Sequence, residues 1–218
     1  MTLTLAVDTT ADRGSIALAD ESGVREEVTL DAPRGFSQVI FGEIEALLDR
    51  QGVALGDIRL FAGASGPGSF TGVRVGLAAI QGLAETLQRP ALAISNLEAF
   101  GFLGTGELRA TVVDAHRGEV FAALFNARGA AVIAESVLTF SAFVEALGGQ
   151  RVQWISPDEK ILAAVPEGSP IVLAPAAMAA TIAAMAIQRF TSGAVSDPAA
   201  LEANYVRRSD AELLWKEA

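Results

Sequence analysis

The sequence has no cysteine and only one histidine, His116, among its 218 residues. Without cysteine the chain has no disulfide, no thiolate metal ligand and no cysteine nucleophile, which favours a cytoplasmic location. A single histidine also excludes a pair of imidazoles one helical turn apart, an arrangement that can hold one metal ion. The sequence therefore predicts no metal site in this chain.

Positive charge is scarce as well. The chain carries 16 Lys and Arg against 26 Asp and Glu, a net charge of −10, and no basic run is longer than the pair Arg207-Arg208. Such a surface repels a phosphate backbone, which proteins normally hold with clustered cations. If RNA is involved, we expect another subunit to hold most of it.

The chain also lacks a long, strongly apolar run. Its longest apolar stretch, from Ile171 to Ile187, is rich in alanine and interrupted by Pro175 and Thr181. This stretch falls short of the ~20 apolar residues of a membrane span, and no membrane contact is expected. The first ten residues have no basic region and reach Asp8, so no signal peptide is expected. With 51% hydrophobic and 19% charged residues, the composition favours a globular protein of one large or two small domains.

Hydrophobic periodicity predicts an alternation of strands and helices. In the first half, strands are expected at 3–7, 15–19, 24–30, 58–64 and 91–94, and helices at 37–50, 71–88 and 96–103. In the second half, strands are expected at 110–113, 119–126, 131–139, 152–155 and 171–173, and helices at 141–147 and 176–190. This order is typical of an α/β protein.

The two halves begin alike. Asp8 and Asp114 each end an apolar strand, and each is followed by a glycine-containing loop and a returning strand. The repeat predicts an actin-like or RNase H-like (ASKHA) fold of two duplicated lobes, each a mixed sheet with flanking helices. The expected bounds are 1–104 for the first lobe and 105–218 for a second, smaller or degenerate lobe. The alternative is two unrelated hairpins that share a common turn residue.

The segment Asp8-Thr9-Thr10 has two interpretations. In actin-like ATPases and related sugar kinases, an aspartate and hydroxyls in this hairpin approach the metal and phosphates of ATP. Alternatively, Asp8 and Thr9 hydrogen-bond their own loop, as these residue types readily do. The sequence leaves both interpretations open.

The glycine-rich string GPGSFTGVRVG occupies residues 66–76. It has neither the spacing and lysine of a Walker A loop nor the third glycine of the dinucleotide fingerprint, because Thr71 stands there. A glycine-rich turn that enters a helix can still bind an anion. We favour packing and interface formation, with Ser69 or Thr71 as the helix cap and with Gly72 and Gly76 letting another helix approach closely.

Four motifs together resemble the TsaB (YeaZ) family. They are LAVDTT at residues 5–10, GPGSFTGVRVG at 66–76, VDAHRGEVF at 113–121 and NYVR at 204–207. The resemblance therefore touches both halves of the chain. Departures are Phe36, where a histidine often enters the first helix, Phe121, where tyrosine is usual, and His116, where other residues are common.

Membership in this family implies a non-catalytic subunit of the bacterial tRNA threonylcarbamoyladenosine modification complex. The subunit would pair as a heterodimer with the metal-binding TsaD transferase and work with the TsaE ATPase, contacting tRNA only indirectly. ATP or ADP and metal would lie on the partner subunits, with no cofactor in this chain, and a homodimer is possible when the chain is alone. Asp8, Thr9, Thr10 and Asp114 would be at most a vestigial nucleotide site. The partner surface would use the first-lobe helices, with candidate residues Val39, Ile40, Gly42, Glu43, Thr71, Gly72, Arg74, Val75, Gly76 and Ala79.

Other functions find less support in the residues. A stand-alone actin-fold ATPase or small kinase would use Asp8, Thr9 and Asp114, but the glycine pair expected where adenosine meets the second lobe is missing from 172–177. A metallopeptidase would need a nucleophile or a histidine pair that the chain lacks.

Gly42 lies within a predicted helix at a cost of about 1 kcal/mol relative to alanine, which indicates close packing either inside the chain or against a partner.

Overall fold

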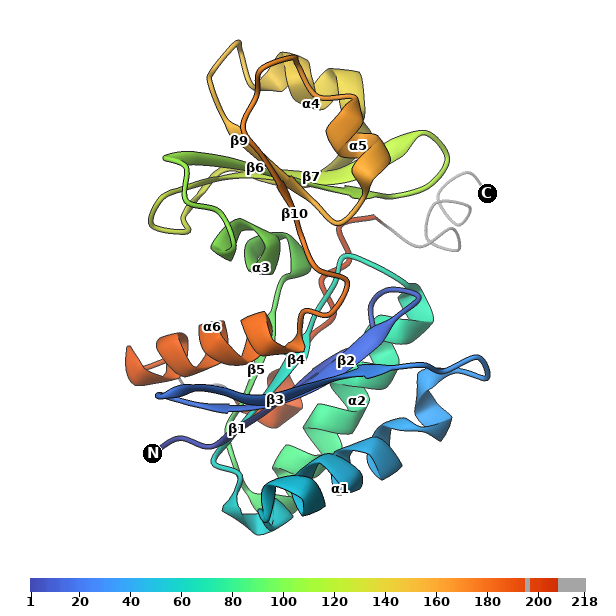
Figure 1. Cartoon of the computed structure of the whole chain (residues 1–218), viewed down its shortest axis with the longest axis vertical. Helices are drawn as coiled ribbons and strands as arrows, with labels where there is room; N and C mark the ends of the chain where they lie inside the picture. Colours follow the sequence, from blue (N-terminus) through green and yellow to red (C-terminus); the bar gives the residue numbers. More distant parts are fainter. Residues whose placement is uncertain (195–196, 208–218) are drawn as a thin grey trace. The chain divides into compact units, whose positions relative to one another are not determined.

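The computed structural model describes residues 1–194 and 197–207, which form two compact units. The first lobe consists of Met1–Ala99 and Pro175–Ala203. The second lobe consists of Phe100–Ala174 and the segment that begins at Asn204. Each lobe contains one five-stranded sheet (Figure 1).

The sheet of the first lobe has the order β3-β2-β1-β4-β5. Its strands are β1 (Thr4–Asp8), β2 (Gly14–Asp20), β3 (Gly23–Leu30), β4 (Leu60–Ala64) and β5 (Ala91–Ile94). The first three strands form an antiparallel meander, whereas β4 and β5 run parallel to β1. Every residue of β1, β2 and β4 is buried, because helices cover both faces of this sheet.

Two helices cover one face of this sheet and one helix covers the other (Figure 1). These are α1 (Ile40–Gln51) and α2 (Phe70–Leu87) on one side, and α6 (Ala179–Thr191) on the opposite side. The predicted helix from residue 37 begins as a 3-10 turn, η1 (Phe36–Gln38), before α1 starts. As predicted, Gly52 follows α1 as its stop, and its φ of 62° is the left-handed value that glycine adopts without strain.

The second lobe repeats the topology of the first. Its sheet has the order β10-β9-β6-β7-β8, with an antiparallel meander β6-β7-β8 and with β9 and β10 parallel to the central strand. The strands are β6 (Leu108–Asp114), β7 (Glu119–Asn126), β8 (Ala131–Thr139), β9 (Gln153–Ser156) and β10 (Ile171–Leu173). The predicted duplication is therefore confirmed, since β1 corresponds to β6 and each following strand has its counterpart.

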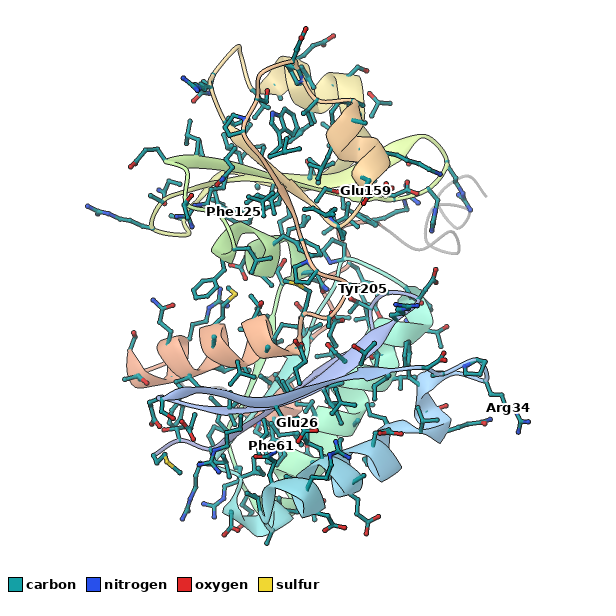
Figure 2. The ribbon with its side chains drawn as sticks, in the orientation of Figure 1. Glu26, Arg34, Phe61, Phe125, Glu159 and Tyr205 are labelled. Carbon is teal, nitrogen blue, oxygen red and sulfur yellow. The ribbon has the colours of Figure 1, made fainter. Side chains whose placement is uncertain are left out.

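Two short helices cover one face of the second sheet (Figure 1). They are α4 (Phe140–Ala146) and α5 (Glu159–Ala163), of which α5 was not predicted from the sequence. The remaining elements are α3 (Asn96–Phe102), η2 (Leu55–Asp57) and η3 (Pro198–Ala200). Phe61 belongs to the apolar core of the first lobe (Figure 2), and Phe143 belongs to that of the second, so each lobe has its own core.

The helix α6 makes the division of the chain differ from the expected bounds of 1–104 and 105–218. This helix buries an apolar side, including Ile182 and Ile187, and it packs on β1, β2 and β4. The hydroxyl of Ser15 accepts hydrogen bonds from the amides of Met178 and Ala179, at 3.1 and 2.9 Å. The first sheet needs this helix to cover its second face, so the chain returns to the first lobe after β10.

The alanine-rich stretch singled out in the sequence is thus divided between a strand and a helix. Ile171–Leu173 is β10, and the helix begins at Ala179 rather than at the expected residue 176. Within residues 1–194 and 197–207, no helix has both the length and the apolar character needed to cross a membrane.

Candidate functional site

The loop after β1 is closed by its own hydrogen bonds. Asp8 is only 3% exposed, and its Oδ1 accepts hydrogen bonds from the backbone amide and the hydroxyl of Thr10, at 2.9 and 2.6 Å. The hydroxyl of Thr9 donates to the carbonyl of Gly72 at 2.7 Å. These bonds are the self-contained arrangement that the sequence analysis offered as the alternative to a phosphate site.

Asn96 joins this loop to the glycine-rich turn. Its Nδ2 donates to the Thr10 hydroxyl at 2.7 Å, and its Oδ1 accepts from the amide of Gly66 at 2.9 Å. The backbone of Asn96 also donates to the carbonyl of Gly66 at 2.8 Å. Asn96 was not predicted as a site residue from the sequence. The signal was its place just after β5, because the carboxyl ends of the parallel strands β1, β4 and β5 meet at one edge of the sheet.

The glycines of residues 66–76 are explained by the closeness of the same loop. A Cβ on Gly72 would lie 1.9 Å from the Thr9 carbonyl oxygen, and one on Gly68 would lie 2.4 Å from the Thr10 carbonyl oxygen. A Cβ on Gly76 would lie 2.5 Å from the Thr9 hydroxyl. The residue type is thus required by packing inside the first lobe. What approaches α2 is the Asp8 loop, in place of the second helix that the sequence suggested.

The helix cap at this turn is Ser69. Its hydroxyl accepts a hydrogen bond from the amide of Gly72 at 3.3 Å, while its own amide donates to the Thr10 carbonyl at 2.7 Å. Of the two predicted candidates, Ser69 and Thr71, the cap is therefore Ser69. The chain itself therefore supplies acceptors for part of the free backbone N–H groups at the start of α2.

Burial dominates the electrostatics of Asp8. Loss of hydration raises the pKa of the Asp8 carboxyl above its ordinary value of 3.8, while the hydrogen bonds from Thr10 act in the opposite direction. The negative charge of Glu27 adds to the increase in the pKa. Glu27 also accepts a hydrogen bond from the amide of Ala180 at 2.8 Å, so a carboxylate of the chain occupies the start of α6.

The corresponding loop of the second lobe is open. The side chain of Asp114 is 49% exposed, and its Oδ1 accepts a hydrogen bond from the amide of His116 at 2.8 Å. The imidazole of His116 is 87% exposed and lies 3.2 Å from Asp114 Oδ2. His116 and Arg117 both have positive φ, at 60° and 57°. The structure therefore places Asp114 and Asp8 in matching hairpins of separate lobes with different environments.

The C-terminal motif NYVR belongs to the second lobe. Arg207 donates a hydrogen bond to the carbonyl of Ala115 at 2.9 Å and forms an ion pair with Glu119. It also lies over the ring of Phe121, 5.7 Å from the centroid. Arg207 thus fastens the chain to the β6–β7 hairpin, whereas Arg208 lies outside the described residues. In the described part of the chain, no group of three or more acidic or histidine side chains is placed to hold a metal ion.

The ten predicted partner-binding residues divide between the interior and the surface of the first lobe. The buried members are Ile40, Gly72, Gly76 and Ala79. The half-buried members are Val39, Glu43 and Val75, and the exposed ones are Gly42, Thr71 and Arg74. Only the second and third groups are accessible at the surface of the first lobe.

Further exposed residues on α1 and α2 extend this surface. Phe41 is 55% exposed and Phe70 is 48% exposed, and the guanidinium of Arg74 lies 3.5 Å from the centroid of the Phe70 ring. Ala78 and Gly82 follow Arg74 on the exposed side of α2, where a Cβ on Gly82 would meet nothing within 4 Å. We call the exposed residues Phe41, Gly42, Phe70, Arg74, Ala78 and Gly82 the outer helix surface. Helical spacing places Phe41 near the direction of the buried Leu48, seven residues later, so the exposure of Phe41 could not be predicted from the periodicity.

Comparison with known proteins identifies relatives of this chain. A family model described as tRNA N6-adenosine threonylcarbamoyltransferase (TsaD) matches residues 24–197. The tRNA threonylcarbamoyladenosine biosynthesis protein TsaB of Escherichia coli (strain K12) is 36% identical over 121 residues, which are 54% of this chain and 52% of the relative. The protein of the same description from Bacillus subtilis (strain 168) is 33% identical over 124 residues, covering 56% and 54% of the two chains. The chain thus matches about half the length of these curated relatives.

Solved structures extend the similarity to nearly the whole chain. YeaZ from Pseudomonas aeruginosa superposes with a TM-score of 0.76 and is 26% identical, covering 94% of this chain and 100% of the other. A second structure, described as an uncharacterized protein with similarity to peptidase YEAZ from Pseudomonas aeruginosa, gives a TM-score of 0.80 at 27% identity, covering 95% and 100%.

A more distant structure, the activator of 2-hydroxyisocaproyl-CoA dehydratase from Clostridium difficile with bound ADPNP, gives a TM-score of 0.52 at 12% identity. It covers 88% of this chain and 96% of the other, and it supports the fold alone. The predicted two-lobed actin-like fold is confirmed by these likenesses. The chain belongs to the tRNA N6-adenosine threonylcarbamoyltransferase family and, within it, to the TsaB (YeaZ) group.

Proposed function

We propose that this chain is a non-catalytic subunit in the formation of threonylcarbamoyladenosine on tRNA. In this role it docks on a TsaD-like transferase, works with a TsaE-like ATPase, and contacts tRNA indirectly. Metal and nucleotide are held by the partner subunits, and the subunit acts in the cytoplasm. The TsaB relatives, described as tRNA threonylcarbamoyladenosine biosynthesis proteins, support the process, and membership in the TsaD family supports a partner of related fold.

The observation that carries the proposal is the closed loop after β1. In an actin-like enzyme the aspartate and hydroxyls of this loop would be available to metal and phosphate. Here the Asp8 carboxylate and the Thr9 and Thr10 hydroxyls are all engaged within the chain. Opening the loop would leave buried polar groups without partners, each at a cost of about 1–3 kcal/mol.

The outer helix surface supports the docking part of the proposal. Phe41, Phe70 and Ala78 present apolar atoms on two adjacent helices of one lobe, and Gly42 and Gly82 leave room for another backbone. Exposed aromatic side chains are typical anchors of protein interfaces. Arg74 adds a cation over an aromatic ring at the same surface. A homodimer in the absence of the partner would use the same residues.

Reconstituted tRNA modification tests the function directly. The TsaD-like and TsaE-like subunits of the same organism would be assayed with tRNA, substrates and ATP, with and without this chain. We expect modification to require the chain, and the chain alone to modify no tRNA. Equal modification without it would overturn the proposal.

Matched substitutions test the docking surface. F41D and A78R should each weaken co-elution with the TsaD-like subunit at least tenfold, because they place charge in the outer helix surface. V24D is the control, since Val24 is 49% exposed on β3 in the same lobe. Unchanged co-elution of F41D and A78R, with folded protein confirmed by circular dichroism, would contradict this docking surface.

The alternative of a stand-alone ATPase has its own measurement. Pure chain should hydrolyse no ATP above a buffer control. Turnover that is abolished by D8A and retained by the surface variant V24D would favour the ATPase over the non-catalytic subunit. The actin-like fold supplies no argument by itself, because one fold hosts many functions.

A further inference from the structure

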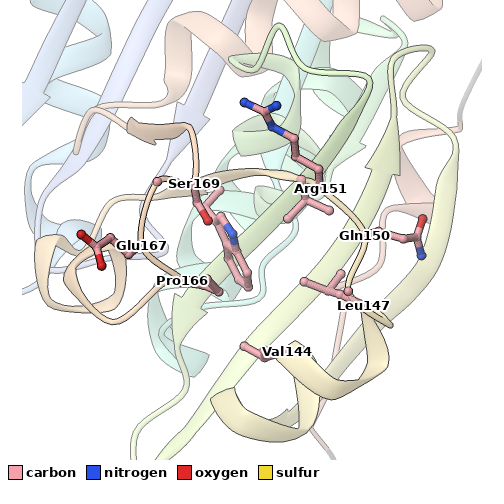
Figure 3. Close-up of a pocket in the computed structure, with 11 residues that line it drawn as sticks. Val144, Leu147, Gln150, Arg151, Pro166, Glu167 and Ser169 are labelled. Atoms are coloured by element: carbon pink, nitrogen blue, oxygen red, sulfur yellow. The ribbon is translucent and has the colours of Figure 1, made fainter.

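A pocket of about 340 Å³ opens in the second lobe, between the end of α4 and the loops that precede β9 and β10 (Figure 3). Its apolar wall includes Val144, Leu147, Val152 and Trp154. The volume is at the lower end of the range for ligand pockets, which suits a single apolar group better than a nucleotide.

Trp154 forms a rigid part of this wall. Its ring is held by Phe140 and Phe143, with centroid distances of 5.6 and 6.0 Å, and the residue is only 2% exposed. Its indole N–H donates no hydrogen bond to any residue of 1–194 and 197–207. The nitrogen is not fully buried, so a ligand can reach it. A nearly buried tryptophan usually donates to an acceptor. A ligand of this pocket would therefore carry both an apolar group and a hydrogen-bond acceptor.

The pocket continues to an open edge of the sheet. β10 pairs with β9 on one side, with Ile171 opposite Trp154, and no described strand pairs with its other side. Residues opposite each other on adjacent strands share a face, so Ile171 extends the apolar surface from the pocket to the edge. Ile171 and Leu173 are 54% and 52% exposed. The edge itself offers unpaired backbone N–H and C=O groups.

We propose that the pocket and β10 together form a docking site for an extended, apolar segment of a partner protein. The segment pairs its backbone with β10 and places one aliphatic or aromatic side chain in the pocket, with an oxygen of the segment accepting from Trp154. Arg151 and Glu167 on the rim carry opposite charges, so an uncharged segment fits best. This mode, in which the backbone supplies affinity and the pocket supplies specificity, is used by several peptide-binding domains.

Other occupants match fewer of these features. A small apolar molecule would fill the pocket but leave Ile171, Leu173 and the backbone edge of β10 uncovered. A second copy of this chain would bring a net charge of −10 against the same charge, a repulsion that an uncharged segment does not meet. The inference does not depend on the function proposed above, because all of its residues lie in the second lobe.

The test uses the full chain and a defined peptide. The probe is an acetylated and amidated seven-residue peptide of alternating threonine and valine with leucine at its centre. The variant W215F leaves Trp154 as the single tryptophan, since the sequence has two. We expect the peptide to change the Trp154 emission and the amide NMR shifts of β10 together, saturating below about 1 mM.

Substitutions at the site and at the opposite edge make the test specific. I171K and V144E should each weaken peptide binding at least tenfold. V132K is the matched control, because Val132 is 51% exposed on β8, the other edge strand of the same sheet. Binding that is lost equally in V132K, or retained in both I171K and V144E, would overturn the proposal.

Two further outcomes would also overturn it. One is no saturation by the peptide when NMR shows the chain to be folded. The other is a full response of both signals to N-acetyl-leucinamide alone, which would make the pocket a site for small molecules and leave the β10 edge without a role.

Discussion

The two lobes carry the same hairpin at the end of their central strand, yet they place its aspartate in opposite environments. Asp8 is 3% exposed and is covered by the glycine-rich turn, whereas the side chain of Asp114 is 49% exposed and is hydrogen-bonded by His116. The difference comes from the next parallel strand. After β4 the chain enters the long helix α2 through its glycines, but after β9 it enters the five-residue helix α5, capped by Asp158.

The duplicated topology therefore positions an aspartate in each lobe but does not determine whether its carboxylate is buried or exposed. In the first lobe a second segment closes over the carboxylate, and each nearby polar group then has to find a partner inside the chain. In the second lobe none of the described residues closes over the carboxylate of Asp114, which is half exposed, and water can satisfy it. Local sequence after the neighbouring strand therefore decides whether such a loop is closed or open.

The strongest test of this difference is an added methyl group at the closed loop. G72A should lower the free energy of unfolding by about 3 kcal/mol or more, because the new Cβ would lie 1.9 Å from the Thr9 carbonyl oxygen. G118A, in the open hairpin, should cost about 1 kcal/mol, because Gly118 has a φ of +78° but free space around it. Urea denaturation of the two variants makes the measurement. Equal losses would contradict the contrast between the hairpins.

Removing the bridging amide should have the next largest effect. N96A leaves the Gly66 amide without its acceptor and removes the donor to the Thr10 hydroxyl, which keeps its bond to Asp8, and it should cost about 2–3 kcal/mol. D114A, which removes an exposed acceptor, should change stability by less than about 1 kcal/mol. Thermal unfolding followed by circular dichroism would compare them. A loss in D114A as large as in N96A would show that the open hairpin is as tightly bound as the closed one.

The pH dependence of stability isolates the buried charge. Because the pKa of Asp8 is raised in the folded state, its carboxyl contributes stability below its ordinary value of 3.8 that is lost as the pH rises through the folded-state pKa. D8N keeps an acceptor oxygen and has no charge to bury. We expect wild type to lose stability relative to D8N as the pH rises from 3 to 7, measured by urea denaturation at each pH. The opposite slope would mean that the hydrogen bonds from Thr10 outweigh burial.

The smallest expected effect separates buried from open glycines within α2. A Cβ on Gly82 would meet nothing within 4 Å, so G82A should stabilise the chain by about 0.5–1 kcal/mol through its higher helix propensity. G76A, on the inner side of the same helix, should destabilise it, because its Cβ would lie 2.5 Å from the Thr9 hydroxyl. The two melting temperatures are expected to move in opposite directions. A shift in the same direction would contradict this assignment of the faces of α2.

Much of the architecture could be predicted because it depends on residues that are close together in the sequence. The order of strands and helices followed from periodicity, and the position of α2 followed from a capping serine and a glycine-rich turn. The short helix α5 was missed because five residues give no helical period. The contact that explains Gly72 could not be predicted, because Thr9 lies 63 residues away in the sequence.

The site was accessible to the sequence only in part. The motifs located Asp8 and Gly72 but not the fact that each satisfies the packing of the other. Ile40 and Ala79 were placed on the partner surface although both are buried in the first lobe, since a motif does not show which side of a helix faces the sheet. Asn96 was missed because its role depends on strand order, which brings the ends of β1 and β5 to one edge. Whether the exposed residues bind a partner stays a prediction.

The return of α6 to the first sheet has a consequence for how the chain is made. As the ribosome synthesises the protein, all five strands of the first lobe emerge before the helix that covers their second face. The strands of the second lobe, by contrast, lie in one continuous stretch and emerge together. Domains commonly fold in the order of synthesis, but here the lobe that begins first cannot be completed until all five strands of the other have been synthesised. The bare face of β1 and β2 is then the surface that a nascent chain most needs to have protected.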